Sequence, residues 1–464
     1  MPSMDLVIRN GTVLTLEGPR RMDVGIVDSR IAGVDESLAG QEEVDASGCY
    51  VLPGGIDPHV HLQMPAGDVV SSDDFASGTI AAALGGTTTV IDFVEPEPGE
   101  PLLEALRKRR AEADGRVAID YSLHMTIPTW HAGHPGSLRS LRAQLPDVVD
   151  AGVSSFKLYM AYEGFRLDDA QLYGVIAAVR EVGGLPLVHC ENGPICALLR
   201  SRALARGETS PICHAATRPP RQEAEAVSRI IDIAALAGSP VYIVHVSCEA
   251  ALARIQTARA HGDAVLSETC PQYLFLDQSA LSGTNGERLI CAPPLRTWSD
   301  REALWDGLTK GDIDVLATDH CPFVAAEKAG HPDFTTVPGG LPSIEARLAL
   351  SHSARARRGL NKRSGMSLER WSQVCSTNAA DIFGLSGKGR VAVGFDADIV
   401  VFDPEQEVVL EAGKTLHENV DWTPYAGTRL RGWTRDVVSR GRIIVREGEF
   451  VGRVGEGGFV SRAP

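Results

Sequence analysis

The stretch GGIDPHVHL, residues 54–62, begins the repeating pattern that decides the fold of this 464-residue chain. It belongs to the first of eight apolar or β-branched runs, each followed by a stretch of helical periodicity such as AQLYGVIAAVREV at 170–182. The eight runs lie at 51–62, 87–94, 117–127, 154–162, 186–192, 241–248, 264–273 and 314–323. Eight strand–helix units in a chain of this length are typical of an α/β protein built as a (β/α)8 TIM-like barrel.

The main alternative fold is an open, doubly wound parallel sheet. Such sheets bind phosphate groups with a glycine-rich loop that directly follows a strand. No glycine-rich motif of this kind follows any of the eight runs, so we expect the closed barrel.

The two ends of the chain have a different pattern. Short alternating strands separated by Gly and Asp occur at 4–52 and again at 388–450. They predict a small β-sandwich domain built from both termini, in which residues 1–53 join residues 388–464 and their C-terminal tail. Residues 54–387 then form the barrel domain.

The composition excludes several classes of protein and partner. With 44% hydrophobic and 23% charged residues, the chain has the balance of a globular protein rather than a disordered or fibrous one. A net charge of −15 disfavours nucleic acid and acidic membranes as partners, and no apolar run is long enough for a membrane helix. A small molecule is the expected partner.

Cysteine usage and the N-terminal residues bear on the compartment. Nine cysteines are scattered without a C-x-x-C pair, and an odd number without a disulfide framework is typical of reduced thiols. The first residues lack the basic and apolar segments of a secretory signal. Both observations predict a cytoplasmic location.

Side chains able to bind a metal lie at the ends of the strand runs. His59 and His61 end the first run and, being two residues apart, point to the same face of a strand. His189, His245 and Asp319 lie at the ends of the fifth, sixth and eighth runs. Because the strand C-termini of a barrel open on one face, we expect these five side chains to converge. Imidazole and carboxylate ligands suit a divalent transition metal.

Each histidine taken alone has a simpler interpretation, since a single strand histidine is more often a core residue than a ligand. Four histidines and an aspartate at the same ends of the strands are a different matter, because chance seldom assembles such a set. The other nine of the thirteen histidines, His134 and His320 among them, lack this placement, and we expect them to be structural.

Lys157 lies inside the fourth run, in the apolar segment FKLYMA. Burying an unpaired ammonium is costly, so an inward-facing Lys157 is expected to have a lowered pKa. The alternative is that its side chain extends to the surface, as lysine side chains normally do. Beside metal ions, a neutral amine has a further option, which is to take up carbon dioxide and form a bridging carbamate.

A series of short motifs resembles the cyclic amidohydrolases, in particular the D-hydantoinase/dihydropyrimidinase branch. In chain order these are GGIDPHVHL, FKLYMAYEG, LVHCEN, IVHVS, TCPQYLFLD, CAPPLR and ATDHCPF. The resemblance extends to GFDADIVVFDP at 394–404 and to HENVDWTPYAGTRLRGW at 417–433, so it spans essentially the whole chain.

The resemblance implies a binuclear metal site, and every ligand of that site is present. One zinc ion would be held by His59, His61 and Asp319, the other by His189 and His245, with Lys157 carboxylated on its Nζ and bridging both. Metal-free relatives that serve as cytoskeletal scaffolds have lost these ligands, so their presence here favours an enzyme. Two metals that share a water make it acidic enough to act as a nucleophile near neutral pH.

The resemblance also implies roles for residues around the metals. Asp319 is expected to act as the general base, and Tyr162 to donate a hydrogen bond to the developing oxyanion. Tyr162 lies five residues after Lys157, so the chain must leave strand geometry before Tyr162 if both side chains face the site. Without the resemblance, Tyr162 would be interpreted as a tyrosine packed on the barrel rim.

Further residues are expected to form the substrate pocket. Ala292 in CAPPLR and Gly339 in VPGGLP stand where the family often has Ser and Asn, and there the substrate ring is contacted mainly through backbone groups. Ala66, Tyr159 and Phe165 are expected to surround the ring substituent. Because Ala66 is small, we hypothesise tolerance of bulky aromatic substituents.

The expected reaction is the opening of a neutral cyclic ureide. After the HxH motif the chain has Gln63 and Met64, where dihydroorotases carry an arginine for the substrate carboxylate and allantoinases have Glu-Pro-Gly. A 5-substituted hydantoin or a dihydropyrimidine would give an N-carbamoyl amino acid, and the residues do not separate these two substrates. Another cyclic-amide hydrolase, such as an allantoinase or imidase, and a non-catalytic oligomeric scaffold are the alternatives.

The resemblance finally implies a homotetramer. The basic residues Arg429, Arg431 and Arg435 near the C-terminus would serve subunit contact or form a solvated face, and the sequence leaves both interpretations open.

Overall fold

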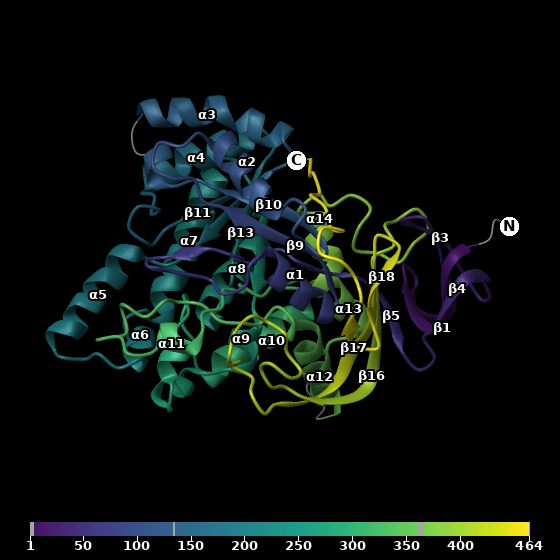
Figure 1. The fold of residues 1–464 in the computed structure, drawn as a ribbon. Coiled ribbons are helices and arrows are strands. Elements are labelled where there is room, and N and C mark those ends of the chain that lie inside the picture. The colour runs from purple at the N-terminus through teal and green to yellow at the C-terminus, as the bar shows by residue number, and fades with distance from the viewer. Residues whose placement is uncertain (1–3, 133–134, 361–364, 464) are drawn as a thin grey trace.

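A computed structural model describes residues 4–132, 135–360 and 365–463 of the chain (Figure 1). The prediction for His134 lies outside these residues. Within them, no helix combines the length and the apolar character needed to cross a membrane.

Eight parallel strands form the central sheet, which confirms the predicted barrel architecture. In chain and spatial order they are β6 (Gly55–Asp57), β9 (Thr87–Val94), β10 (Asp120–Thr126), β11 (Ser155–Tyr159), β12 (Leu185–His189), β13 (Val241–Ile243), β14 (Val265–Thr269) and β15 (Val315–Leu316). Helices surround this sheet in Figure 1. The longer ones are α1 (Phe75–Leu84), α2 (Leu102–Ala113), α3 (Pro135–Asp150), α4 (Asp169–Glu181), α5 (Gly193–Ala205), α7 (Pro220–Leu236), α8 (Glu249–His261), α10 (Trp298–Lys310) and α12 (Arg347–Leu360).

Shorter elements complete the barrel. They are β7 (Pro65–Ala66), β8 (Val69–Val70), α6 (Ile212–Ala216), α9 (Pro271–Phe275), α11 (Ala325–Lys328), α13 (Leu368–Ser372) and α14 (Asn378–Ile382). Local signals explain where several helices begin and end. Reciprocal capping boxes start α4 at Asp168 and α10 at Thr297, and glycines in the left-handed conformation end α8 at Gly262 and α10 at Gly311.

The backbone next to two predicted ligands closes the barrel between its last and first strands. The amide of Asp319 donates to the carbonyl of His59 at 2.9 Å, and the amide of His61 donates to the carbonyl of His320 at 2.8 Å. These hydrogen bonds lie beyond the ends of β15 and β6, so the closing seam of the barrel runs through the segments that carry the site.

Except for the run at 87–94, which coincides with β9, the predicted strand runs are longer than the strands themselves. The first run divides at Gly54, since β5 (Tyr50–Pro53) belongs to the terminal sheet and only β6 joins the barrel. A Cβ at Gly54 would lie 2.1 Å from Oγ1 of Thr88, so the crossing between the two sheets requires glycine there. In the later runs the chain leaves strand geometry at the C-terminal ends, where the polar residues lie.

Both termini contribute to one nine-stranded sheet beside the barrel (Figure 1). Its strands are β1 (Met4–Thr15), β2 (Gly18–Val27), β3 (Arg30–Asp35), β4 (Gly40–Asp45), β5, β16 (Ile399–Val409), β17 (Arg429–Ser439), β18 (Arg442–Arg446) and β19 (Glu449–Phe450). Most neighbours are antiparallel, but β1 pairs in parallel with β4 and β5. The sheet has its own core around Ile8, Val24, Val51 and Ile399.

The last residues of the chain leave this sheet and lie against the barrel. The amide of Tyr121 in β10 donates to Gly458 at 3.0 Å, and the amide of Val460 donates back to Tyr121 at 2.7 Å. The buried guanidinium of Arg462 then donates to the hydroxyls of Ser122 and Ser155. The tail thus joins the terminal sheet to the strands of the barrel.

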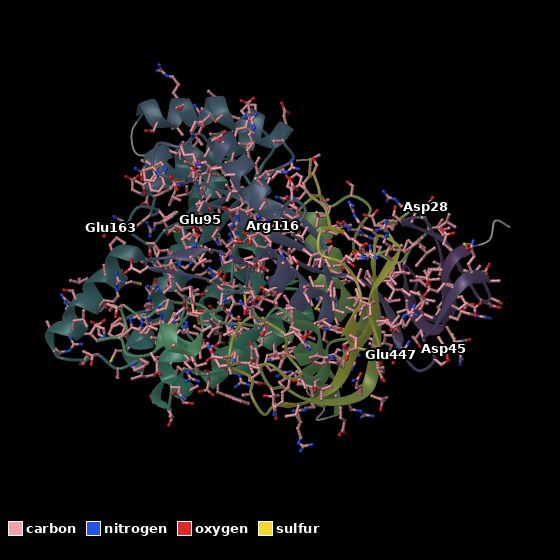
Figure 2. The ribbon with its side chains drawn as sticks, viewed as in Figure 1. Asp28, Asp45, Glu95, Arg116, Glu163 and Glu447 are labelled. Atoms are coloured by element: carbon pink, nitrogen blue, oxygen red, sulfur yellow. The ribbon has the colours of Figure 1, made fainter. Side chains whose placement is uncertain are left out.

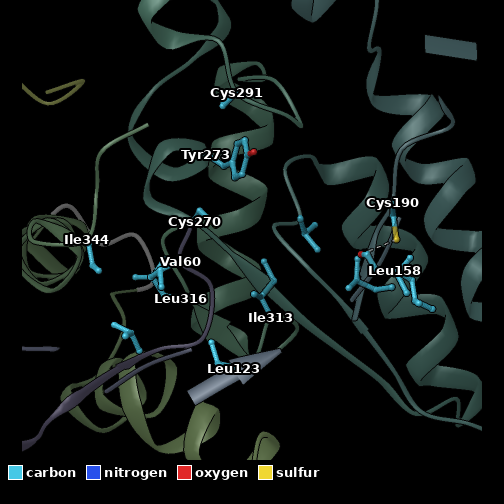
Figure 3. Packing of buried hydrophobic residues seen from close by; sticks show 14 of the residues in the cluster. Val60, Leu123, Leu158, Cys190, Cys270, Tyr273, Cys291, Ile313, Leu316 and Ile344 are labelled. Carbon is cyan, nitrogen blue, oxygen red and sulfur yellow. Dashed lines mark hydrogen bonds between the residues drawn. The ribbon is translucent and has the colours of Figure 1, made fainter. Parts of the chain in front are cut away.

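The main hydrophobic core includes Val90, Leu123, Val188 and Leu316 of the barrel strands, while Ile91, Leu187 and Val315 of the same strands belong to a separate cluster. Figure 3 shows part of the main core, including Leu123, Leu158 and Leu316 from three different strands as well as Cys190 and Cys270. All nine cysteines are free thiols, and all except Cys213 are buried. In this core, cysteine acts as a small apolar residue.

Candidate active site

The predicted ligands converge on one cavity at the C-terminal ends of the barrel strands. His59 and His61 follow β6, Lys157 lies in β11, and His189 is the last residue of β12. His245 lies two residues beyond β13 and Asp319 three residues beyond β15. All six line a cavity of about 460 Å³.

Three of these side chains form a compact donor set. Oδ1 of Asp319 lies 3.2 Å from Nε2 of His59 and 3.2 Å from Nε2 of His61. Ligand atoms of the three residues all lie within 4.8 Å of one another, close enough to hold one metal ion. Nε2 of His59 is buried without a hydrogen-bond partner in the described structure, and such an orphan is costly unless something binds it. The donor set therefore fits a divalent metal.

His189 and His245 form a second group beside the first. Nδ1 of His189 lies 2.9 Å from Nε2 of His245, and the two rings meet edge to face. The ring of His245 lies 5.5 Å from that of His59, so the four imidazoles form one continuous cluster. The paired nitrogens and the cavity they face suit a second metal position.

Lys157 points into the barrel rather than to the surface. Its side chain is buried, with Nζ 5.0 Å from the ring of Phe93 and 5.3 Å from that of Tyr159. Burial lowers the pKa of Lys157 to about 8, although the carboxylates of Glu268 and Asp319 oppose this. The amine is therefore far more easily deprotonated than an ordinary lysine.

The surroundings set the charge of the other ligands. Burial and the nearby positive charge of Lys157 lower the pKa of His59, and burial also lowers the pKa values of His189 and His245. These imidazoles are therefore neutral, the form in which histidine binds metals. Burial opposes ionisation of Asp319, but the imidazoles of His59 and His61 hold the pKa of this carboxyl below its ordinary value.

Several site residues have a backbone conformation that is uncommon outside glycine. The φ angles of Tyr162, His245 and Asp319 are 68°, 39° and 53°, and Gln63 has a φ of 50°. Tyr162, His245 and Asp319 lie beyond the ends of their strands, and all three line the cavity, whereas Gln63 does not. For Tyr162, this explains how a residue five positions after Lys157 reaches the same cavity.

A second layer of side chains orients the ligands, and the sequence analysis missed it. Glu268 contacts Nδ1 of His59 and accepts from the hydroxyl of Tyr242 at 2.9 Å. Glu191 lies 3.0 Å from Nε2 of His189 and contacts the buried guanidinium of Arg218. Carboxylates of this kind fix the ring orientation of a metal-binding histidine. Acidic residues inside the apolar runs 186–192 and 264–273 were the available signal.

The six residues predicted to contact the substrate all line the cavity. They are Ala66, Tyr159, Tyr162, Phe165, Ala292 and Gly339. The ring of Tyr159 lies 5.8 Å from that of Tyr162 and 5.5 Å from that of Phe165, so these three form an aromatic wall. Tyr162 is 38% exposed, and partial desolvation of its hydroxyl in the cavity raises its pKa, so the hydroxyl stays protonated and able to donate.

Charged residues that the sequence analysis did not identify also reach this cavity. Glu95 follows β9 and Glu163 follows Tyr162, and Figure 2 labels both on the barrel side of the molecule. Arg200 of α5 and Arg218 also line the cavity. The cavity thus contains arginines, although none follows the HxH motif, and Arg218 is paired with Glu191.

The structure also places His320 and the three arginines near the C-terminus. His320 is buried, lies 3.0 Å from a carboxylate oxygen of Asp73 and is not among the residues that line the cavity. Arg429, Arg431 and Arg435 lie in β17, not in a free tail, because this segment completes the terminal sheet. Arg431 contacts Glu405, and Arg435 donates to Asp436 at 2.7 Å.

Comparisons with known proteins agree with this geometry. The model of the family described as "Amidohydrolase family" matches residues 50–444. A D-hydantoinase of Geobacillus stearothermophilus is 43% identical over 99% of this chain and 97% of its own length. A D-phenylhydantoinase of Escherichia coli O1:K1 is 39% identical over 99% of both chains. The crystal structure of a dihydropyrimidinase from Brevibacillus agri NCHU1002 superposes with a TM-score of 0.94 at 40% identity, covering 99% of each chain.

The matches extend over the barrel and the terminal sheet alike, and they agree with the donor set found at the strand ends. The chain belongs to the amidohydrolase family.

Proposed function

We propose that this protein hydrolyses the ring amide of 5-substituted hydantoins, of dihydropyrimidines, or of both, to N-carbamoyl amino acids. In this reaction the oxygen of water adds to a ring carbonyl carbon, the ring C–N bond breaks, and a proton passes to the leaving nitrogen. Relatives named D-hydantoinase, D-phenylhydantoinase and dihydropyrimidinase, matched over nearly the full chain, support this substrate class.

The proposed cofactor is a pair of zinc ions. His59, His61 and Asp319 would hold one ion, and His189 and His245 the other. The orphaned Nε2 of His59 and the lowered pKa values of His59, His189 and His245 support this assignment. Bound metals would supply Lewis acidity toward the carbonyl and lower the pKa of water.

Lys157 is the proposed bridge between the two metal positions, as a carbamate formed with carbon dioxide. Its amine must be neutral to react, and a pKa lowered to about 8 makes the neutral fraction near physiological pH much larger than that of an ordinary lysine. Conversion to a carbamate would also replace the buried ammonium of Lys157 with an anion, next to the positions proposed for the metal cations.

Two side chains would carry the proton and the developing charge. Asp319 would accept a proton from the attacking water and deliver it to the leaving nitrogen. The protonated hydroxyl of Tyr162 would donate to the oxyanion that forms at the attacked carbonyl. Glu268 and Glu191 keep the imidazoles of His59 and His189 in place while this happens.

Different walls of the cavity are proposed to contact the ring of the substrate and its substituent. The backbone at Ala292 and Gly339 is proposed to contact the ring, and Ala66, Tyr159 and Phe165 to surround the substituent. The aromatic wall and the small side chain of Ala66 favour bulky, flat substituents.

One observation carries the proposal: donor groups from five different strand ends converge on a single cavity. The test is to measure kcat/KM for dihydrouracil and for 5-phenylhydantoin with protein supplied with zinc and bicarbonate. Opening of either ring, lost on removal of the metal, is expected. Activity on neither ring would refute the proposal. Stoichiometric zinc would then favour another cyclic amide as substrate, and substoichiometric zinc a non-catalytic scaffold.

The domain boundaries, the oligomeric assembly and the cellular location are part of the same proposal. The two domains would comprise residues 1–53 with 388–464, and 54–387, because β5 and β6 join different sheets on either side of Gly54. A homotetramer would be the assembly, which light scattering tests directly. The cytoplasmic location stays a prediction from the sequence.

A further inference from the structure

Lys328 is a buried cation that the proposed reaction does not use. It ends the short helix α11, and its side chain is completely inaccessible to solvent. Lysine is almost never fully buried unless its charge is paired or strongly hydrogen-bonded. The position therefore requires a compensating interaction strong enough to hold an ammonium group out of water.

That interaction is a set of three hydrogen bonds to backbone carbonyls. Nζ of Lys328 donates to Ile290 at 3.1 Å, to Pro338 at 2.8 Å and to Gly340 at 2.8 Å. An ammonium has three N–H groups, so all of its donors are used. Burial lowers the pKa of Lys328 to about 8, although the nearby groups of Cys291, Cys321 and Glu287 oppose this.

The three carbonyls belong to two separate segments of the cavity wall. Ile290 directly precedes Cys291 and Ala292, while Pro338 and Gly340 lie on either side of Gly339. Ile290, Cys291, Ala292, Gly339 and Gly340 all line the cavity that contains the metal ligands. The amide of Gly340 also donates to Ile290 at 3.0 Å, so both segments meet at the ammonium.

The same wall is fixed to the strand end that carries Asp319. Gly340 has a φ of 150°, and a Cβ there would lie 2.3 Å from the carbonyl oxygen of Cys321. The amide of Cys321 donates to Leu341 at 3.1 Å. A displacement of either wall segment would therefore change its distance from the general base.

We propose that Lys328 is a positioning residue that joins these two backbone segments and thereby holds the wall that contacts the substrate ring. The inference rests on the proposed function, because it assigns the ring rather than the substituent to this wall. Removing the ammonium of Lys328 should weaken binding of the substrate ring by the same factor, whichever substituent the ring carries. Small displacements of positioning groups have large kinetic effects.

The experiment compares Lys328→Met with Lys388→Met. Methionine keeps the length of the side chain but removes every donor. Lys388 is also buried, and its Nζ donates to Asp120 at 2.8 Å. Asp120 is the first residue of β10, so this contact lies at the opposite end of the strands from the cavity. For Lys328→Met we expect KM to rise about tenfold or more for both hydantoin and 5-phenylhydantoin, by the same factor. Zinc content should stay unchanged, and Lys388→Met should leave KM at the wild-type value.

Three results would overturn the inference. They are a KM of Lys328→Met within twofold of wild type, an effect confined to the aryl substrate, or an equal rise in Lys388→Met. If Lys328→Met does not fold, Lys328→Gln keeps two donor hydrogens and should raise both KM values by a smaller common factor. An unchanged KM would overturn the inference there too.

Hydrogen exchange separates this inference from the proposed function. Without Lys328, the amides of Cys291, Gly339 and Gly340 should exchange faster, whether or not the wild-type protein opens either ring. Unchanged exchange would refute the positioning role. Inactive wild-type protein with faster exchange in the variant would refute only the proposed function.

Discussion

Replacing Lys157 with methionine should make the metal-free protein more stable while abolishing its activity. Burial moves the pKa of Lys157 from its ordinary value of 10.5 to about 8. This difference corresponds to about 3 kcal/mol by which the folded chain disfavours the protonated lysine. Methionine has similar length and carries no charge, so Lys157→Met should recover about 3 kcal/mol of unfolding free energy at pH 7.

The stability difference between Lys157→Met and wild type should depend on pH, because the folded and unfolded chains bind different numbers of protons at Lys157. Between about pH 8 and 10.5 the unfolded chain binds more protons at Lys157 than the folded chain, so wild-type stability rises with pH in this window. The advantage of Lys157→Met is therefore complete below about pH 8 and disappears toward pH 10.5. Lys388 is the contrasting control, because Asp398 and Asp120 raise its pKa despite burial, and Lys388→Met should be less stable than wild type at pH 7.

The assay is urea unfolding of the chelator-treated proteins at pH 7 and pH 10, followed by tryptophan fluorescence. The difference in midpoints multiplied by a common m value gives the difference in free energy. A Lys157→Met protein no more stable than wild type at pH 7, or an advantage of the same size at both pH values, would refute the reasoning. Zinc and bicarbonate should reduce or reverse the advantage of Lys157→Met, because only the wild-type protein has the amine that can form the carbamate and thereby bind the metals more tightly.

Three other substitutions, one of them with a matched control, test separate parts of the site. Ala66→Phe should narrow the substituent pocket and lower the ratio of kcat/KM for benzylhydantoin over methylhydantoin, and an unchanged ratio would show that Ala66 does not face the substituent. Tyr162→Phe removes the proposed oxyanion donor, so kcat should fall about 100-fold while zinc content stays constant. Gly340→Ala should destabilise the protein by more than about 1 kcal/mol, as measured by thermal unfolding, because its Cβ would meet the carbonyl of Cys321. Gly339→Ala has open space for a Cβ, and its unfolding temperature should equal or exceed that of wild type.

Much of the fold could be predicted because its signals are local. Apolar runs alternating with helical periodicity predicted all eight barrel strands, and the run at 87–94 coincides with β9. The ends of the runs were predicted less well, since His245 and Asp319 lie beyond their strands in left-handed turns. Periodicity continues through such turns when the following residues are also apolar.

Some residues of the candidate site could likewise be predicted from local sequence, and others could not. The spacing of His59 and His61 predicted that both side chains face the same way, and both line the cavity. Glu268 could not be assigned to His59, nor Lys328 to Gly340, since these contacts depend on how distant segments pack. Arg200 reaches the cavity from a helix, and nothing in its local sequence distinguishes it from a solvated arginine.

The seam between Asp319 and His59 has a consequence for how the protein matures. The backbone that closes the barrel also carries one complete donor set, so that set cannot exist before the last strand docks against the first. Contacts between segments so far apart in sequence form late, because a long loop must close first. A ribosome-bound chain that ends before Asp319 would therefore lack the capacity to retain an ion at this position. Zinc uptake during refolding would then report the final docking step, and a chelator added earlier should not slow the steps that precede it.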